Sequence, residues 1–196
     1  MPDRYENFAE LAEHETGGTD YRIRVLARDL SAAIIAPHGG QIEPGTTELA
    51  VAIAGKTYCL YLFEGIRKNR PHGDLHVTST RFDEPLCLEL IGRCDRVLAL
   101  HGLAGTGSNV YVGGLDTALR DEICTALNAA GFVSEIDTSG SHAANSPDNI
   151  CNKGRQQAGA QLELTRGLRD NLRDDEDALS LFARSVRQAI SQALQS

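Results

Sequence analysis

Pro37-His38-Gly39-Gly40-Gln41-Ile42-Glu43-Pro44-Gly45-Thr46-Thr47-Glu48 is the stretch that decides the fold, because it joins an apolar run to a helical pattern. The apolar run, 32–36, is typical of a strand covered on both faces, so the Gly-rich stretch should lie at the end of that strand. The glycines allow the backbone to bend His38 and Glu43 toward one metal ion, and we interpret the pair as part of a zinc site. The alternative is a Gly/Pro loop whose His and Glu face water.

Length and composition predict one domain over residues 1–196. A chain with 41% hydrophobic and 23% charged residues is typical of a globular protein with a single sizeable core. The net charge of −8 argues against nucleic acid as the main partner, because a nucleic-acid backbone requires a dense Lys/Arg surface. The 5 cysteines form no C-x-x-C pair, so we expect reduced core thiols instead of disulfides or a thiolate zinc finger.

The sequence carries no membrane or export pattern. No window approaches the roughly 18 uninterrupted apolar residues of a membrane span. The first residues, Met1-Pro2-Asp3-Arg4-Tyr5-Glu6, lack the basic-then-apolar pattern of a signal peptide. We therefore expect a cytoplasmic protein without a membrane partner, and the sequence predicts no particular oligomeric state.

Apolar runs alternate with helical patterns along the chain. Strands are predicted over 21–27, 32–36, 57–63, 75–79, 96–100, 109–112, 132–136 and 161–165. Helices are predicted over 3–15, 48–54, 85–91, 116–131 and from 177 onward. This alternation predicts an α/β fold with a mostly parallel sheet flanked by helices.

His101 follows the apolar strand 96–100 directly, and His38 follows 32–36 after a single proline. Ligands of parallel sheets bind outside the carboxyl ends of the strands, so one pocket could hold both imidazoles. A catalytic zinc ion needs three protein ligands and an open position for water. His38, Glu43 and His101 would supply that set.

Glu163 lies between two leucines in the predicted strand 161–165, where an unpaired buried carboxylate would cost free energy. We interpret Glu163 as the general base that takes a proton from the zinc-activated water and passes it to the leaving amine. The alternative is ordinary strand alternation with an outward-facing carboxylate. The Ser-, Gly- and Asn-rich stretch 138–149 is unusually long for a loop, which favours a mobile or active-site loop.

Five motifs occur in a fixed order along the chain: P-H-G-G-x-I-E-P-G-T-T-E-L-A (37–50), L-H-V-T-S-T-x-F-D-E-P (75–85), L-A-L-H-G (98–102), V-Y-V-G-G (110–114) and N-I-C-N-K-G through G-A-Q-L-E-L-T (149–165). From about residue 20 to its end, the chain resembles the poly-γ-glutamate hydrolase family of phage and bacterial proteins. That family is similar to the zinc carboxypeptidases and N-acylglutamate deacylases in its open α/β fold. The resemblance implies one zinc ion on His38, Glu43 and His101, with Glu163 as the base. The first motif departs from the carboxypeptidase H-x-x-E by its longer spacing.

Other residues in or beside the motifs are candidates for substrate binding. His76 is open to three interpretations: a fourth ligand, a core histidine, or a residue that binds a substrate carboxylate or steadies the transition state, which we favour. Arg81, Arg155 and Arg166 carry forked guanidinium groups that suit a glutamyl carboxylate, although each could equally be a solvated charge. A local basic patch of this kind would let an acidic protein bind a polyanion and predicts salt-sensitive binding.

Together these features predict a zinc-dependent hydrolase of the γ-glutamyl amide bonds of poly-γ-glutamate. Within the same chemistry, the alternative is a zinc deacylase of small N-acyl amino acids. From a different class, the alternative is a non-catalytic phage accessory or replication protein. The complete set of candidate ligands and base argues against this alternative. The resemblance also implies release by lysis if the protein is phage-encoded.

Overall fold

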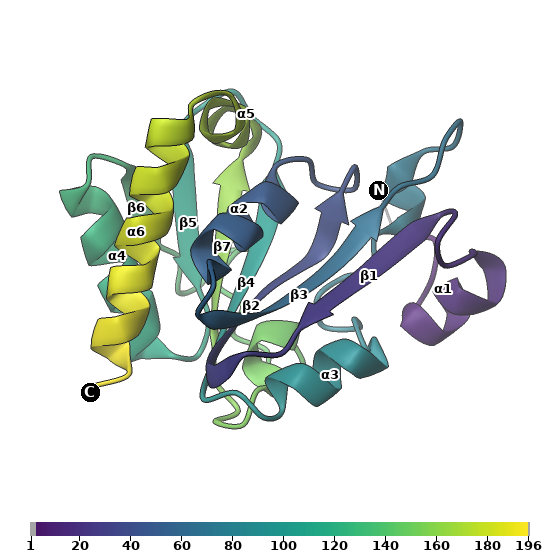
Figure 1. Cartoon of the computed structure of the whole chain (residues 1–196), viewed down its shortest axis with the longest axis horizontal. Coiled ribbons are helices and arrows are strands. Elements are labelled where there is room, and N and C mark those ends of the chain that lie inside the picture. The colour runs from purple at the N-terminus through teal and green to yellow at the C-terminus, as the bar shows by residue number, and fades with distance from the viewer. Residues whose placement is uncertain (1–2, 196) are drawn as a thin grey trace.

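The computed structural model describes residues 3–195, which form one seven-stranded sheet with helices on both faces (Figure 1). The strands are β1 Tyr21–Leu26, β2 Asp29–Gly40, β3 Tyr58–Gly65, β4 Arg96–Leu103, β5 Asn109–Gly113, β6 Val133–Ile136 and β7 Ala160–Thr165. The helices are α1 Phe8–His14, α2 Thr46–Ala54, α3 Pro85–Ile91, α4 Thr117–Ala129, α5 Arg166–Asp174 and α6 Glu176–Ala193, with short 3-10 helices η1 His72–Leu75 and η2 Ile150–Lys153.

The sheet is mixed, with the strand order β1-β3-β2-β4-β7-β5-β6. Its four central strands, β3, β2, β4 and β7, run parallel to one another, whereas β1 and β5 run antiparallel to their inner neighbours. The carboxyl ends of the central strands therefore meet at one edge of the sheet. This arrangement confirms the predicted α/β fold with an open, mostly parallel or mixed sheet.

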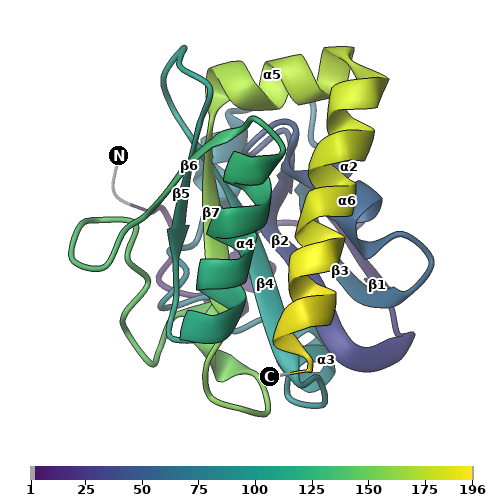
Figure 2. The same ribbon diagram turned by 90° about the vertical axis from the view of Figure 1, so that its left-hand side faces the viewer.

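Each central strand contributes side chains to two cores, because successive residues point to opposite faces. Ile34 of β2 packs with α2, α4, α5 and α6, and Ile35 packs on the opposite face with α1 and α3. Figure 2 shows α4 and α6 over the first face, with α5 across their upper end. Burial of both faces explains why the strand appears in the sequence as a continuous apolar run.

One prediction about secondary structure is wrong, and one helix was not predicted. The run 75–79 was predicted as a strand but is irregular, because its backbone groups bond to side chains: the N–H of Thr78 donates to Asp3, and the carbonyl of Val77 lies 2.8 Å from a ring nitrogen of His38. The residues after Thr165 form α5, which the sequence analysis did not predict.

The prediction of free, mostly buried thiols agrees with the structure. All five cysteines are free, and Cys59, Cys87, Cys94 and Cys151 are buried. None of the helices described between residues 3 and 195 is long and apolar enough to cross a membrane.

Candidate metal centre

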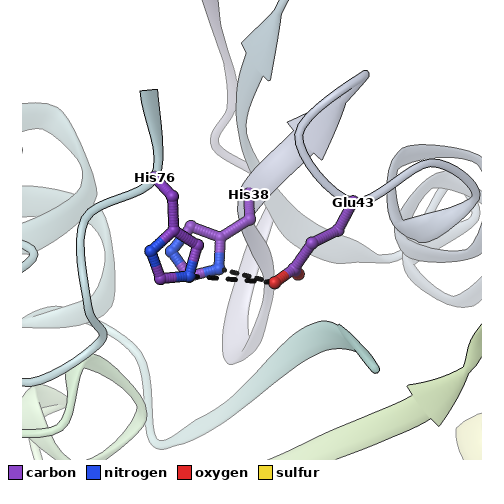
Figure 3. Close-up of side chains that lie close together, drawn as sticks. All are labelled: His38, Glu43 and His76. Atoms are coloured by element: carbon purple, nitrogen blue, oxygen red, sulfur yellow. Dashed lines mark ion pairs between the residues drawn. The ribbon is translucent and has the colours of Figure 1, made fainter. Parts of the chain in front are cut away.

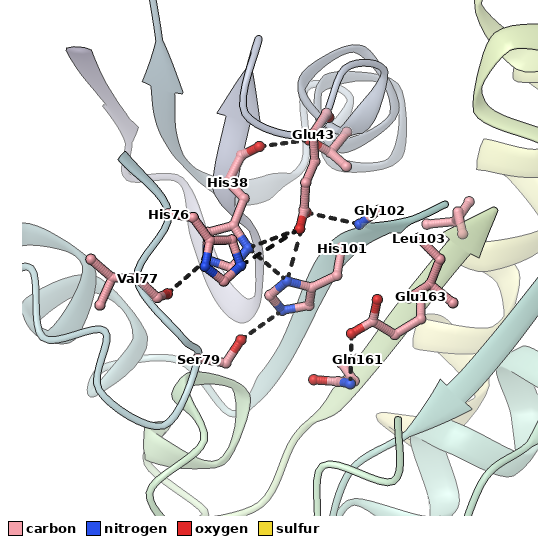
Figure 4. Close-up of polar contacts among 12 residues, drawn as sticks. His38, Glu43, His76, Val77, Ser79, His101, Gly102, Leu103, Gln161 and Glu163 are labelled. Carbon is pink, nitrogen blue, oxygen red and sulfur yellow. Dashed lines mark hydrogen bonds and ion pairs between the residues drawn. The ribbon is translucent and has the colours of Figure 1, made fainter. Parts of the chain in front are cut away.

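Three parallel strands bring the predicted site residues together at one edge of the sheet (Figure 4). His38 lies near the carboxyl end of β2, His101 in β4 and Glu163 in β7. His101 and Glu163 are register partners across β4 and β7, so their side chains project from the same face of the sheet. Together with Glu43 and His76, these residues line a cavity of about 550 Å³.

The turn after β2 carries Glu43 back toward the sheet. Gly40 has a φ of +63°, a left-handed conformation that favours glycine. The N–H of Glu43 donates to the carbonyl of His38 at 2.9 Å. Its Oε2 accepts a hydrogen bond from the N–H of Gly102 at 2.8 Å, which anchors the carboxylate beside His101.

The facing atoms of His38, His101 and Glu43 lie at separations that suit a metal ion. The Nδ1 of His38 lies 3.2 Å from the Nδ1 of His101 and 3.3 Å from Oε1 of Glu43. The Nδ1 of His101 lies 3.9 Å from Oε2 of Glu43. Ligand atoms held tetrahedrally at about 2.0–2.1 Å from zinc are roughly 3.3 Å apart, so a small adjustment brings all three onto one ion.

The outer nitrogens of both histidines already have partners. The Nε2 of His38 lies 2.8 Å from the carbonyl of Val77, which only accepts, so Nε2 carries a proton and Nδ1 faces the site. The Nε2 of His101 lies 3.3 Å from the hydroxyl of Ser79. Such bonds to the outer nitrogen fix the tautomer and ring orientation of metal-binding histidines.

His76 forms an overlapping group with His38 and Glu43 (Figure 3). One ligand atom from each of these residues lies within 4.8 Å of the others. The Nε2 of His76 is 3.9 Å from Oε1 of Glu43, and its ring stacks on that of His38 with centroids 4.0 Å apart. The side chain of His76 is 34% exposed, against 3% for His101. His101 is therefore the more buried of the two candidates for a third ligand, and His76 lies in the cavity wall.

Burial and neighbouring charges shift the pKa values of this cluster. Burial raises the pKa of Glu43, but His38 and His101 outweigh this effect and lower it to about 2. Burial lowers the pKa of His101 to about 3, and the charge of His38 acts in the same direction. Burial lowers the pKa of His38, whereas Glu43 raises it overall. Glu43 is thus a carboxylate and His101 a neutral imidazole, the forms that bind metals.

Glu163 lines the same cavity as His38, Glu43 and His101 and adds a second carboxyl group to it. Burial raises the pKa of Glu163 to about 8, and the charge of Glu43 acts in the same direction. The side-chain amide of Gln161 donates to Oε1 of Glu163 at 3.2 Å, and that of Asn149 donates to Gln161 at 3.1 Å. A carboxyl group with a pKa near neutrality is suited to general acid–base chemistry.

The loop predicted over 138–149 forms another wall of the cavity. Its lining residues are Gly140, Ser141, Ala143, Ala144, Asn145, Ser146 and Asn149. Thr78, Ser79 and Thr80 also line the cavity. The cavity is therefore rich in hydroxyl and amide groups, which can donate hydrogen bonds to carboxylates.

The three predicted arginines lie outside the cavity, and within residues 3–195 it is lined by neither Arg nor Lys. The N–H of Arg155 donates to the carbonyl of Cys94, which precedes β4, so Arg155 lies at the edge of the sheet opposite His101. Each arginine is paired with a carboxylate: Arg81 with Asp3, Arg155 with Asp95 and Arg166 with Asp170. The structure does not bring these arginines together at the site, because acidic neighbours hold them elsewhere, and their role in substrate binding stays a prediction.

Arg169 is a supporting residue that the sequence analysis missed. Its buried guanidinium donates to the carbonyls of Leu103 at 2.9 Å, Leu164 at 3.1 Å and Pro44. A Cβ at Gly102 would lie 2.5 Å from the guanidinium carbon, so any larger residue there would have to displace the Arg169 side chain. Arg169 thereby joins the turn after β2 to the ends of β4 and β7.

The open α/β sheet is a fold shared with other solved structures. A Burkholderia mallei protein provisionally named a carboxypeptidase matches with a TM-score of 0.53 and 15% identity, over 88% of this chain and 59% of that chain. At this identity the likeness concerns the fold alone. More specifically, the chain belongs to the poly-gamma-glutamate hydrolase family, whose model matches residues 5–192.

Relatives support this assignment in sequence and structure. The SPbeta prophage-derived UPF0714 protein YoqZ of Bacillus subtilis (strain 168) is 40% identical over 164 residues, which is 83% of this chain but only 59% of the relative. The structure of a bacteriophage poly-gamma-glutamate hydrolase matches with a TM-score of 0.92 and 32% identity over 97% of each chain. A structure described as "YNDL-apo (Zinc-free)" matches with a TM-score of 0.90 and 33% identity over 97% of this chain and 98% of that chain.

Proposed function

We propose that this protein hydrolyses γ-glutamyl amide bonds of poly-γ-glutamate and uses one zinc ion held by His38, Glu43 and His101. Family membership over residues 5–192 supports the substrate class. The observation that carries the metal site is the 3.2 Å approach of the Nδ1 atoms of His38 and His101 beside a carboxylate. Two imidazole lone pairs repel at that distance, so a proton or a cation must lie between them.

The donor set supports zinc as the cation. Two imidazoles and one carboxylate are a common ligand set of catalytic zinc, and they leave a fourth position open. The relative described in a zinc-free form supports the same choice. Zinc, when bound, polarises a carbonyl and makes a water molecule a stronger acid.

Glu163 is the proposed general base. It would take a proton from the attacking water, and then give it to the leaving nitrogen as the C–N bond breaks, which leaves a carboxylate and an amine. Its place beside His101 and the hydrogen bond from Gln161 hold the carboxyl group toward the cavity. A divalent cation nearby would favour the ionised form that a base needs.

The cavity walls would bind the substrate. Poly-γ-glutamate carries a free carboxylate on each residue, and the hydroxyl and amide groups of the 138–149 loop and of Thr78, Ser79 and Thr80 can donate to it. His76 would contact the reacting part of the substrate through its Nε2. Arg81 and Arg166 remain proposed contacts for parts of the polymer outside the cavity.

A substrate comparison tests this function. The protein should lower the viscosity of poly-γ-glutamate and generate new amino groups, and Glu163→Gln should abolish both effects. Release of amine from N-acetylglutamate without any change in the polymer would instead assign a deacylase. Inactivity on both substrates with zinc bound would favour a non-catalytic protein.

A further inference from the structure

The first residues that the structure describes are joined to the segment that forms one cavity wall. Arg4 pairs with Asp74 at 2.8 Å, and the N–H of Phe8 donates to Asp83 at 2.8 Å. Asp3 bonds to the same segment at residues that line the cavity. The chain before α1 is therefore attached to the wall that carries His76.

Asp3 has a side chain that is only 4% exposed and accepts three hydrogen bonds. The donors are Nδ1 of His76 at 2.7 Å, the N–H of Thr78 at 2.7 Å and the guanidinium of Arg81 at 2.6 Å. Burial raises the pKa of Asp3, but the bonds from Thr78 and His76 outweigh this and lower it to about 2. The group is therefore a carboxylate, which only accepts hydrogen bonds.

The contact with Asp3 determines which nitrogen of His76 faces the site. Because a carboxylate cannot donate, the hydrogen of the 2.7 Å contact belongs to Nδ1 of His76. Stacking on His38 fixes the plane of the ring, and Nε2 then lies 3.9 Å from Oε1 of Glu43. In its neutral form the ring therefore presents the lone pair of Nε2 to the cavity.

We propose that Asp3 is a positioning residue that fixes the orientation and tautomer of His76. A neutral His76 held in this way accepts a hydrogen bond at Nε2, from water or an N–H of the substrate, and does not donate to a substrate carboxylate. Arg81 supports Asp3 from the other side, which gives that arginine a structural role. Paired carboxylates of this kind orient histidines at metal and catalytic sites. The expected effect on turnover rests on the proposed function, but the tautomer does not.

Asp3→Asn is the sharpest test. The N–H of Thr78 needs an acceptor, so the amide oxygen of the new side chain would stay on Thr78 and its NH2 would face His76. Nδ1 would then have to accept, which moves the ring proton to Nε2. Nitrogen-15 spectra of the histidine rings distinguish these tautomers in the zinc-free protein at about pH 8, where histidines are ordinarily neutral. The signals of His76 are assigned by their loss in His76→Gln.

We expect the Nδ1–H tautomer in the wild type and the Nε2–H tautomer in Asp3→Asn. In zinc-loaded Asp3→Asn, kcat should fall about 10- to 100-fold, the loss typical when a histidine at a metal site loses its hydrogen-bond partner. The change in KM should be smaller. A wild-type His76 with its proton on Nε2, or one tautomer shared by both proteins, would overturn the proposal. The wild-type spectrum alone tests the predicted tautomer, even if Asp3→Asn folds poorly. The tautomer can also be measured if the protein proves to have no hydrolytic activity.

Asp74→Asn is the matched control. It removes the charge that pairs with Arg4, in the same attachment of the chain, and with Arg67, and it leaves the contact between Asp3 and His76 in place. The tautomer and kcat should stay as in the wild type. An equal loss of kcat in Asp74→Asn would show that loosening of the segment, and not the orientation of His76, causes the effect.

Discussion

His101 and Glu163 are direct neighbours across the parallel strands β4 and β7, and both side chains line the same cavity. The register of one strand pair thus places a candidate ligand beside the candidate base. A shift by one residue would turn either side chain to the opposite face of the sheet. The distance between these two candidate residues therefore depends on the sheet more than on any loop.

Glu163→Gln should bind zinc as the wild type does and lose about 100- to 10,000-fold in kcat, because it keeps the shape of the side chain without its basicity. Steady-state kinetics and metal analysis of the same preparation measure both effects. Glu135→Gln, an exposed position in β6, is the control and should leave kcat unchanged. Wild-type turnover in Glu163→Gln would remove Glu163 from the mechanism.

The raised pKa of Glu163 predicts a pH-dependent stability of the zinc-free protein. Its pKa is about 8 in the folded state against 4.5 as the ordinary value, so the folded state holds the proton more tightly. The stability that this proton gives is complete below about pH 4.5 and is lost as the pH rises to about 8. The free energy of unfolding of the wild type should therefore fall relative to Glu163→Gln over that range. Urea denaturation at several pH values checks this, and parallel curves would contradict it.

His101→Gln and His76→Gln should show which histidine binds zinc together with His38 and Glu43. We expect His101→Gln to lower zinc affinity by more than about 100-fold, which exceeds the loss that follows when a metal-binding histidine loses only its hydrogen-bond partner. We expect His76→Gln to retain zinc. Competition with a chromophoric chelator gives both affinities. Loss of zinc in His76→Gln with retention in His101→Gln would make His76 the third ligand.

Arg169→Leu should destabilise the protein, because the buried carbonyls of Leu103 and Leu164 lose their donor. The expected cost is at least about 1–3 kcal/mol, that of one unsatisfied buried group. Arg173→Leu, on the exposed face of the same helix, should change stability by less than about 1 kcal/mol. Denaturant unfolding compares the two variants. Equal changes in the free energy of unfolding would show that Arg169 does not stabilise the strand ends.

The candidate ligands could be predicted from the sequence because their positions follow from local pattern. His38 and His101 each stand at the end of an apolar run, and parallel strands bring such positions to one edge of the sheet. Alternation in β7 also explains where Glu163 points, because Leu162 and Leu164 both pack into the core on the other face of the sheet.

The supporting residues depend on contacts that the sequence does not encode locally. Asp3 meets His76 across 73 residues, and nothing near either residue indicates the other. Arg169 bonds to backbone carbonyls, which carry no residue identity, and the neighbouring Arg166 and Arg173 look the same in the sequence but are exposed. The run 75–79 has the alternation of a strand, yet side chains from elsewhere take its backbone bonds.

The metal content of the purified protein tests the central claim most directly. We predict one zinc ion per chain, loss of poly-γ-glutamate cleavage when a chelator removes it, and recovery when one equivalent of zinc is returned. His38→Gln, which lacks one of the two facing imidazoles, should neither hold the ion nor recover. A metal-free protein that cleaves the polymer at the rate of the zinc-loaded protein would contradict the account.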